Sequence, residues 1–186
     1  MREGVGSNLI RVHSRDSRAL NRAGIALGSN LGDRLGNLRA ARRQLRLLSR
    51  AESPVLASAV YETEPVGCEP GAGAFLNAVV EIGVGGEPQE LLRQLRRIEQ
   101  ELGRPPEHAK NTSRTLDLDL LYFGAEQIRT GVLQLPHPRL HERRFVLQPL
   151  ADIRADLVLP GQMESVGELL ARLGPTPPLV RSATEW

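Results

Sequence analysis

Residues 114–123 place the strongest constraint on what this chain can fold into, because apolar and polar side chains alternate through them. A β-strand sends successive side chains to opposite faces, so this period of two predicts a strand with one apolar face and one acidic face. The apolar face carries Leu116, Leu118 and Leu120, and the polar face carries Thr115, Asp117 and Asp119. The fold must therefore bury one side of this strand and leave two carboxylates on the other.

Asp117 and Asp119 form a candidate metal site. At roughly 3.3 Å of rise per residue, their carboxylates stand about 7 Å apart on one side of a strand. Mg²⁺ prefers carboxylate oxygens, keeps several waters and takes further ligands from substrate phosphates. With Arg114 at its edge, the strand predicts a platform for a magnesium nucleotide. The alternative is a half-exposed strand whose solvent face happens to carry two aspartates, although aspartate is depleted in strands.

Composition is typical of a single globular domain and excludes several functions. Of the 186 residues, 40% are hydrophobic and 25% are charged, which suits a soluble protein with one core. No apolar run approaches the roughly 18 residues that span a bilayer, and the N-terminus lacks a signal-peptide pattern. We therefore expect a cytoplasmic protein that does not bind membranes. The single Cys68 excludes an internal disulfide framework and a cysteine zinc site.

Charge and aromatic content argue against a nucleic-acid partner. The formal net charge is +2, and aromatic residues make up 3% of the chain, too few for a base-stacking platform. Lys110 is the one lysine among 24 basic residues, and arginines suit bidentate contacts with phosphate. A genome that favours arginine codons would produce the same excess of arginine.

The order of predicted elements indicates one α+β domain. Residues 1–22 are arginine-rich and predicted to be a disordered leader, residues 23–173 form the domain, and residues 174–186 are predicted to be a tail. Strands are predicted over residues 24–27, 55–63, 75–84, 114–123 and 128–135, and helices over residues 35–48, 88–102, 143–147 and 164–173. This order lacks the strict alternation of a doubly wound sheet and favours an antiparallel sheet with helices on its faces.

Several polar features are each open to two interpretations. Asn77, early in a strand, either reads the edge of a heterocycle or is an edge-strand residue bonded to backbone. Glu99 shares a flank of its predicted helix with Arg96, three residues earlier, and could be no more than half of an exposed ion pair. His137, between two prolines, favours a phosphate or backbone partner over a metal. The loop of residues 28–33 is either a capped turn or a ligand loop.

A nucleotide would have to be bound without a phosphate loop, because the sequence contains neither GxxxxGK[ST] nor GxGxxG. Phosphoryl-type transfer needs mainly positioning and charge neutralisation. The residues that offer both are Asp117, Asp119, Arg104, Lys110, Arg114 and Arg143. A long polar loop, residues 104–113, leads into the acidic strand and is typical of a lid.

Four motifs, in this order and spacing, resemble the 6-hydroxymethyl-7,8-dihydropterin pyrophosphokinase family over residues 24–173. They are Gly28-Ser29-Asn30-Leu31-Gly32-Asp33, Phe75-Leu76-Asn77-Ala78, Arg114-Thr115-Leu116-Asp117-Leu118-Asp119-Leu120 and Pro136-His137-Pro138. The resemblance implies a ferredoxin-like α/β/α sandwich that acts as a monomer. It also implies transfer of pyrophosphate from MgATP to the pterin hydroxymethyl group, with release of AMP.

The resemblance further implies a role for individual residues. Asp117 and Asp119 would bind two Mg²⁺ ions, and Arg104 and Arg114 would stabilise charge during transfer. On the ATP side, the contacts would come from Glu99, Lys110, His137 and Arg143. The pterin pocket would be lined by Thr63, Pro65, Val66, Phe75, Asn77 and Phe145, with the two phenylalanines stacked on the ring faces.

The chain departs from the family pattern at four places, all in the long loop or on the ATP side. Pro106 stands where many members have a second arginine, and Asn111-Thr112-Ser113 where many have Trp-Gly-Pro. Pro138 replaces an aromatic residue, and Arg96 replaces a glutamine. These changes bear on lid closure and nucleotide affinity, and Lys110 or Arg96 could supply the missing charge.

Two other functions compete with this interpretation. A nucleotide-sugar transferase also uses paired aspartates and a divalent metal, but the chain is short for that class. A ferredoxin-like module that senses a small metabolite would bind a ligand without chemistry. It gives no reason for Asp117 and Asp119 to share a face.

Overall fold

The structure, a computed structural model, describes residues 20–50, 53–65, 71–103 and 113–186. In chain order its elements are β1 (Asn21–Ser29), α1 (Arg34–Leu48), β2 (Leu56–Ala57), β3 (Val60–Thr63), β4 (Phe75–Val84), α2 (Pro88–Glu101), β5 (Asp117–Phe123), β6 (Ile128–Arg129), β7 (Gln134–Leu135), the 3₁₀ turn η1 (Leu140–Glu142), α3 (Arg144–Arg154), α4 (Val166–Leu173) and β8 (Val180–Ala183).

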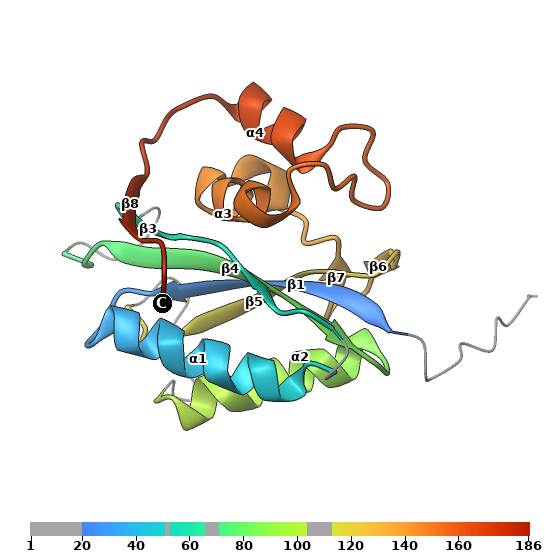
Figure 1. Cartoon of the computed structure of the whole chain (residues 1–186), viewed down its shortest axis with the longest axis horizontal. Helices are drawn as coiled ribbons and strands as arrows, with labels where there is room; N and C mark the ends of the chain where they lie inside the picture. Colours follow the sequence, from blue (N-terminus) through green and yellow to red (C-terminus); the bar gives the residue numbers. More distant parts are fainter. Residues whose placement is uncertain (1–19, 51–52, 66–70, 104–112) are drawn as a thin grey trace, which may run out of the picture.

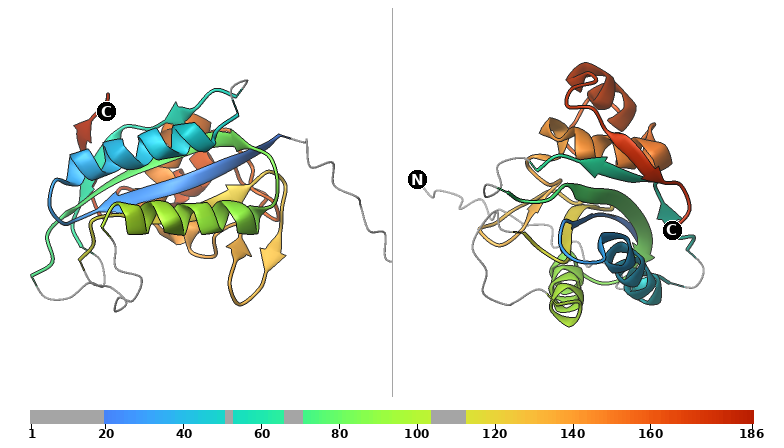
Figure 2. Two further views of the ribbon diagram at one scale, coloured as in Figure 1. Left: turned by 90° about the horizontal axis from the view of Figure 1, so that it is seen from below. Right: turned by 90° about the vertical axis from the view of Figure 1, so that its left-hand side faces the viewer.

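Most strands form one antiparallel sheet that lies between two layers of helices. The strand order is β5-β1-β4-β3-β8, with β2 beside β4, and β6 and β7 form a separate hairpin. Figures 1 and 2 show α1 and α2 on one face of the sheet and α3 and α4 on the other. The order β1-α1-β3-β4-α2-β5 is the ferredoxin-like arrangement. The prediction of an α/β/α sandwich is confirmed.

Alternating side chains on the central strands create two cores. Ile25, Val80 and Leu118 pack with the apolar residues of α1 and α2, while Val79 and Leu121 pack with those of α3 and α4. Because the sheet is covered on both faces, β4 is buried along almost its whole length. The same alternation leaves Asp117 and Asp119 on the side of α3, next to Ala26 and Gly28 of β1.

Local signals explain where the helices begin. The Asp33 side chain accepts a hydrogen bond from the Gly36 N–H at 2.9 Å and caps α1. Pro88 occupies the first turn of α2, where its missing N–H costs nothing. Ser165 and Glu168 form a reciprocal capping box at the start of α4.

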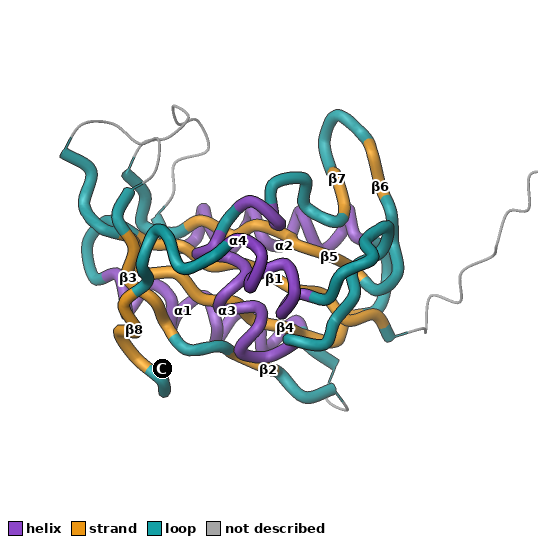
Figure 3. Tube along the Cα trace, turned by 90° about the horizontal axis from the view of Figure 1, so that it is seen from above, coloured by secondary structure: helices purple, strands orange, loops and turns teal. Residues whose placement is uncertain are grey.

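The structure corrects two strand predictions. Residues 128–135 are a hairpin, closed by the Thr130 N–H donating to the Leu133 carbonyl at 3.0 Å, and Figure 3 shows it projecting from one side of the main sheet. Residues 55–63 form two short strands, β2 and β3. Between them, the Ser58 hydroxyl accepts a hydrogen bond from the Val79 N–H at 2.9 Å, which interrupts the backbone pairing with β4.

The predicted boundaries of the domain also change. Asn21 and Arg22, assigned to the leader, belong to β1, because the Arg22 guanidinium finds partners in Ser53, Pro54 and Glu81. The segment predicted to be a tail contains β8, which pairs with β3. The short helix predicted over residues 143–147 continues as α3 to Arg154.

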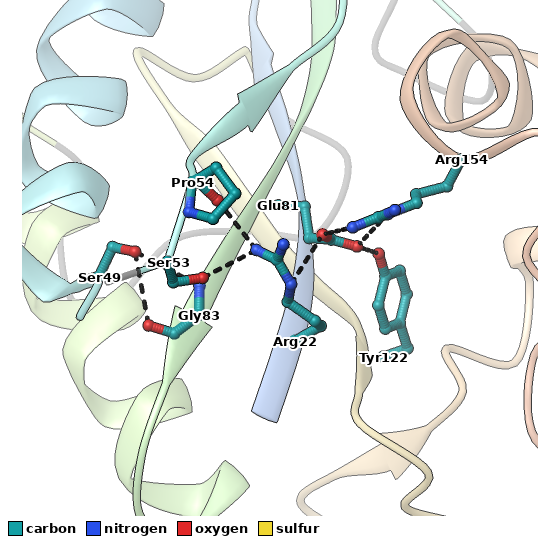
Figure 4. Close-up of polar contacts among 8 residues, drawn as sticks. All are labelled: Arg22, Ser49, Ser53, Pro54, Glu81, Gly83, Tyr122 and Arg154. Atoms are coloured by element: carbon teal, nitrogen blue, oxygen red, sulfur yellow. Dashed lines mark hydrogen bonds and ion pairs between the residues drawn. The ribbon is translucent and has the colours of Figure 1, made fainter. Parts of the chain in front are cut away.

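A buried carboxylate, Glu81 of β4, joins four elements (Figure 4). It accepts hydrogen bonds from the Arg154 guanidinium at 2.6 and 2.9 Å and from the Tyr122 hydroxyl at 2.5 Å, and Arg22 lies 3.5 Å away. Burial alone would raise the pKa of Glu81, but the hydrogen bonds from Arg154 and Tyr122 and the two positive charges outweigh it and lower the pKa. The cluster fixes α3 on the sheet.

No helix in the described ranges is long and apolar enough to cross a membrane.

Candidate active site

Three neighbouring strands bring the predicted site residues together around Gly28. In the sheet register, Gly28 of β1 lies opposite Asn77 of β4 on one side and Asp117 of β5 on the other. A Cβ atom on Gly28 would lie 3.3 Å from the Asn77 Oδ1 atom and 3.8 Å from the Asp117 Cβ atom. The glycine therefore leaves open space between the amide and the carboxylate.

Two cavities meet at the acidic strand. One of about 720 Å³ lies towards α2 and the β6–β7 hairpin, and the other of about 310 Å³ lies towards β3, β4 and α3. Asp117, Asp119 and His137 line both cavities. The two carboxylates thus point to one side of the sheet and stand between two compartments of unequal size.

The charge of the two aspartates is balanced by arginines. A guanidinium nitrogen of Arg114 lies 2.9 Å from an Asp117 carboxylate oxygen, and one of Arg143 lies 3.7 Å from Asp119. Burial, and next the charge of Asp117, raise the pKa of Asp119, although His137, Arg143 and Arg114 oppose this. Two neighbouring carboxylates repel each other, and a bound cation would relieve this repulsion. The site is therefore suited to a cation.

The donor set fits Mg²⁺ better than a metal that needs a closed protein cage. Among the described residues, no group of three or more His, Cys, Asp or Glu side chains could hold an ion. Mg²⁺ commonly binds through one or two carboxylates and completes its shell with waters and substrate phosphates. Asp117 and Asp119, open to both cavities, match that requirement.

The smaller cavity combines a polar wall with two aromatic rings. The Asn77 Nδ2 group donates to the Thr63 Oγ1 atom at 2.7 Å, and Asn77 is only 7% exposed. Phe75 and Phe145 also line this cavity, with the guanidinium of Arg114 6.0 Å from the Phe75 ring centroid. The alternative that Asn77 is an edge-strand residue bonded to backbone is wrong, because β4 is central and the amide bonds a side chain.

Glu99 braces the acidic strand from α2. Its Oε1 atom accepts a hydrogen bond from the Leu118 N–H at 2.8 Å, and the residue is 8% exposed. Since β5 is the edge strand, its outward amide would otherwise lack a ladder partner. The alternative of an exposed ion pair with Arg96 is wrong. Glu99 and Arg96 both line the larger cavity.

His137 is held by backbone on both sides of its side chain. The backbone N–H of His137 donates to the Leu121 carbonyl at 2.8 Å, and the ring Nδ1 atom accepts from the Arg139 backbone N–H at 3.3 Å. Burial lowers the pKa of His137, with Asp119 acting in the opposite direction. A neutral ring whose Nδ1 is an acceptor carries its proton on Nε2, which makes it a hydrogen-bond donor. The predicted backbone partner is present.

Sequence reasoning missed the function of Asn30. Its Oδ1 atom accepts from the Arg114 N–H at 2.7 Å, and its Nδ2 group donates to the Ser113 hydroxyl at 3.2 Å and the Gly73 carbonyl at 3.4 Å. The loop of residues 28–33 is therefore a capped turn that also holds the start of β5. An asparagine directly after the predicted strand was the available signal, but its partners are 43 and 84 positions away.

The remaining residues singled out in the sequence fall either outside the described residues or at the edge of the site. Val66, Arg104, Lys110, Pro106 and Asn111 lie outside the described residues. Pro65 is described but is not among the residues that line the smaller cavity. Pro138 lines the larger one.

The overall fold has known counterparts. A crystal structure of wild-type Plasmodium falciparum HPPK-DHPS with pteroate matches with a TM-score of 0.65 at 13% identity. The match covers 83% of this chain and 42% of that chain, so this chain spans less than half of the solved protein. The likeness concerns the fold.

Sequence comparisons establish the family. The model of the family described as 7,8-dihydro-6-hydroxymethylpterin-pyrophosphokinase (HPPK) matches residues 24–155. The 2-amino-4-hydroxy-6-hydroxymethyldihydropteridine pyrophosphokinase of Bacillus subtilis is 50% identical over 133 residues, 72% of this chain and 78% of that protein. Its namesake from Haemophilus influenzae is 41% identical over 136 residues, 73% of this chain and 83% of that protein.

These matches define a pyrophosphokinase, and the structure shows that it is built on an α+β sandwich. The chain belongs to the 7,8-dihydro-6-hydroxymethylpterin-pyrophosphokinase family. It is therefore a diphosphotransferase of folate biosynthesis.

Proposed function

We propose that this protein transfers pyrophosphate from ATP to the hydroxymethyl oxygen of 6-hydroxymethyl-7,8-dihydropterin in a Mg²⁺-dependent reaction. The observation that carries the proposal is the acidic wall between two cavities of about 720 and 310 Å³. Such a wall suits a reaction in which a triphosphate on one side meets a hydroxyl group on the other.

The reaction needs little covalent work from the protein. The hydroxyl oxygen bonds to the β-phosphorus of ATP, the bond from that phosphorus to the α,β-bridging oxygen breaks, and AMP leaves with the bridging oxygen. The hydroxyl proton passes to solvent. Mg²⁺ held by Asp117 and Asp119 would neutralise phosphate charge. Arg114 and Arg143, close to these carboxylates, would bind the phosphates and stabilise charge during transfer.

The smaller cavity is the proposed pterin pocket. Phe75 and Phe145 would stack on the ring, as flat heterocycles and aromatic side chains prefer. Asn77 and Thr63 would read the polar ring edge. The larger cavity would take ATP, with His137 donating from Nε2 to a phosphate oxygen and Arg96 supplying positive charge at its wall. Action as a monomer and a cytoplasmic location stay predictions.

A coupled assay tests the proposal. AMP release is measured with ATP and the reduced hydroxymethylpterin, with and without Mg²⁺, and with a sugar nucleotide in place of ATP. We expect AMP only when ATP, pterin and Mg²⁺ are all present. Transfer from the sugar nucleotide would favour the glycosyltransferase alternative, and pterin binding without AMP would favour a sensing module.

Replacing Asn77 with alanine is expected to weaken pterin binding by about 1–3 kcal/mol, because polar groups on the ligand would then be buried without partners. Isothermal calorimetry measures this, with Gln94→Ala as a control for the loss of an amide, because Gln94 is half-buried on α2 and does not line the smaller cavity. Unchanged pterin affinity in Asn77→Ala would remove this residue from the pocket.

A further inference from the structure

The C-terminal segment adds a strand to the sheet beside the smaller cavity. β8 lies beyond residue 155, where the family match ends, and pairs antiparallel with β3 through Val60↔Ala183, Tyr61↔Arg181 and Glu62↔Val180. Thr63, the next residue of β3, lines the smaller cavity. Figures 1 and 2 show the chain running from α4 along one end of the molecule to β8.

Arg181 of β8 links this strand to α3 through Tyr61. Its guanidinium donates to the Tyr61 hydroxyl at 3.3 Å, and lies 5.8 Å from the ring centroid and 4.0 Å from Asp152. The Tyr61 hydroxyl lies 2.8 and 3.0 Å from the two Asp152 carboxylate oxygens. Asp152 also accepts from the Ala59 N–H at 3.3 Å. One polar cluster therefore joins β8, β3 and α3.

Trp186 anchors the other end of the segment. Its indole N–H donates to the Ser58 carbonyl at 2.8 Å, and the Arg42 guanidinium lies 5.1 Å from the ring centroid and donates to the Trp186 carbonyl. The indole packs on the core that α1 and α2 share with the sheet. Both ends of β8 are thus attached to the body of the protein.

We propose that residues 174–186 form a strap that positions the two walls of the smaller cavity. Tyr61 lies two residues before Thr63, so their side chains share a face of β3. Asp152 lies seven residues after Phe145 on α3, two helical turns or about 10 Å along the helix. The Tyr61 hydroxyl contacts Asp152 directly, and Arg181 of the strap contacts both partners. By holding Tyr61 at this contact, Arg181 fixes the separation of Thr63 and Phe145. This inference rests on the proposed function, because Thr63 and Phe145 line the proposed pterin pocket.

The experiment compares Arg181→Ala with wild type in steady-state kinetics. We expect the KM for the pterin to rise about tenfold. The KM for ATP should stay within about twofold, because neither Thr63 nor Phe145 lines the larger cavity. Arg172→Ala removes a similarly exposed arginine of α4 from its ion pair with Glu164 and should change neither constant. Arg181→Lys keeps a donor for Tyr61 and should recover most of the pterin affinity.

Trp186→Leu provides a second variant that leaves the Arg181 cluster intact but removes the anchor, and it should raise the pterin KM in the same direction. A lower melting temperature and kcat with an unchanged pterin KM would show that the segment only stabilises the fold, and would overturn the strap. If wild type releases no AMP and binds no pterin, the proposed function fails and the strap fails with it. If wild type is active and Arg181→Ala keeps its pterin KM, the strap alone is wrong.

Discussion

Replacing Asp119 with asparagine is expected to reduce pterin-dependent AMP release about 100- to 1000-fold, the usual cost of removing one charge-stabilising group from a site of this kind. Asp119 lines both cavities and lies 3.7 Å from Arg143, so it stands where phosphate, cation and hydroxyl would meet. Asp117→Asn should have an effect of similar size. Single-turnover measurements at saturating substrates separate this loss from weaker binding.

The same substitution should not destabilise the protein. The pKa of Asp119 is raised in the folded state by burial and by Asp117. A carboxyl whose folded pKa is raised destabilises the fold, with the full penalty above its folded pKa. The penalty shrinks as pH falls through the folded pKa and is absent below the unfolded pKa. Asp119→Asn should therefore melt at the wild-type temperature or higher in metal-free buffer at pH 7.

Magnesium provides the matching control. Millimolar Mg²⁺ should raise the melting temperature of wild type, because a ligand that binds only the native state stabilises it. Asp119→Asn should lose most of this increase, while Asp156→Asn at an exposed position should retain it. Activity close to wild type in either Asp117→Asn or Asp119→Asn would show that these carboxylates do not hold the metal.

Replacing Glu81 with alanine is expected to lower the free energy of unfolding by about 3–5 kcal/mol at pH 7, because breaking a buried ion pair leaves the partner charges uncompensated. The Glu81 side chain is 2% exposed and contacts Arg154, Arg22 and Tyr122. Urea denaturation measures the loss. Glu164→Ala, which breaks the exposed pair with Arg172, should cost less than about 1 kcal/mol.

The Glu81 cluster also predicts acid sensitivity. The pKa of Glu81 is lowered in the folded state, so its contribution to stability is complete above the unfolded pKa of about 4.3 and is lost as pH falls through the folded pKa. Wild type should therefore lose stability steeply below about pH 4, and Glu81→Ala should lose less over the same interval. A cost for Glu81→Ala no larger than that for Glu164→Ala would contradict the importance of the buried cluster.

Local sequence patterns were enough for the fold class and for the acidic strand. The alternation around Asp117 and Asp119 predicted a strand with both carboxylates on one side, and the structure has this arrangement. The helix signals at Asp33 and Pro88 act within a few residues of themselves. Such features depend on backbone period and capping, which neighbouring residues decide.

The errors occurred where a residue finds a partner far away in the chain. Arg22 was assigned to a leader because its neighbours are polar and charged, yet Glu81 gives it a buried partner. Glu99 looked like half of an exposed pair, but the edge position of β5 offers it the Leu118 N–H. Strand β8 lies in a proline-rich segment with no strand period of its own, and it forms because β3 presents an open edge.

Sequence alone therefore predicted the chemical groups of the proposed site: paired acids, arginines to bind phosphate, and an asparagine and two phenylalanines to bind a flat ring. Folding added their arrangement into two compartments with a shared acidic wall, together with the supports from Asn30, Glu99 and Arg181. Side-chain periodicity is a local property of the backbone, whereas cavities and buried polar partners exist only after distant segments pack and exclude water.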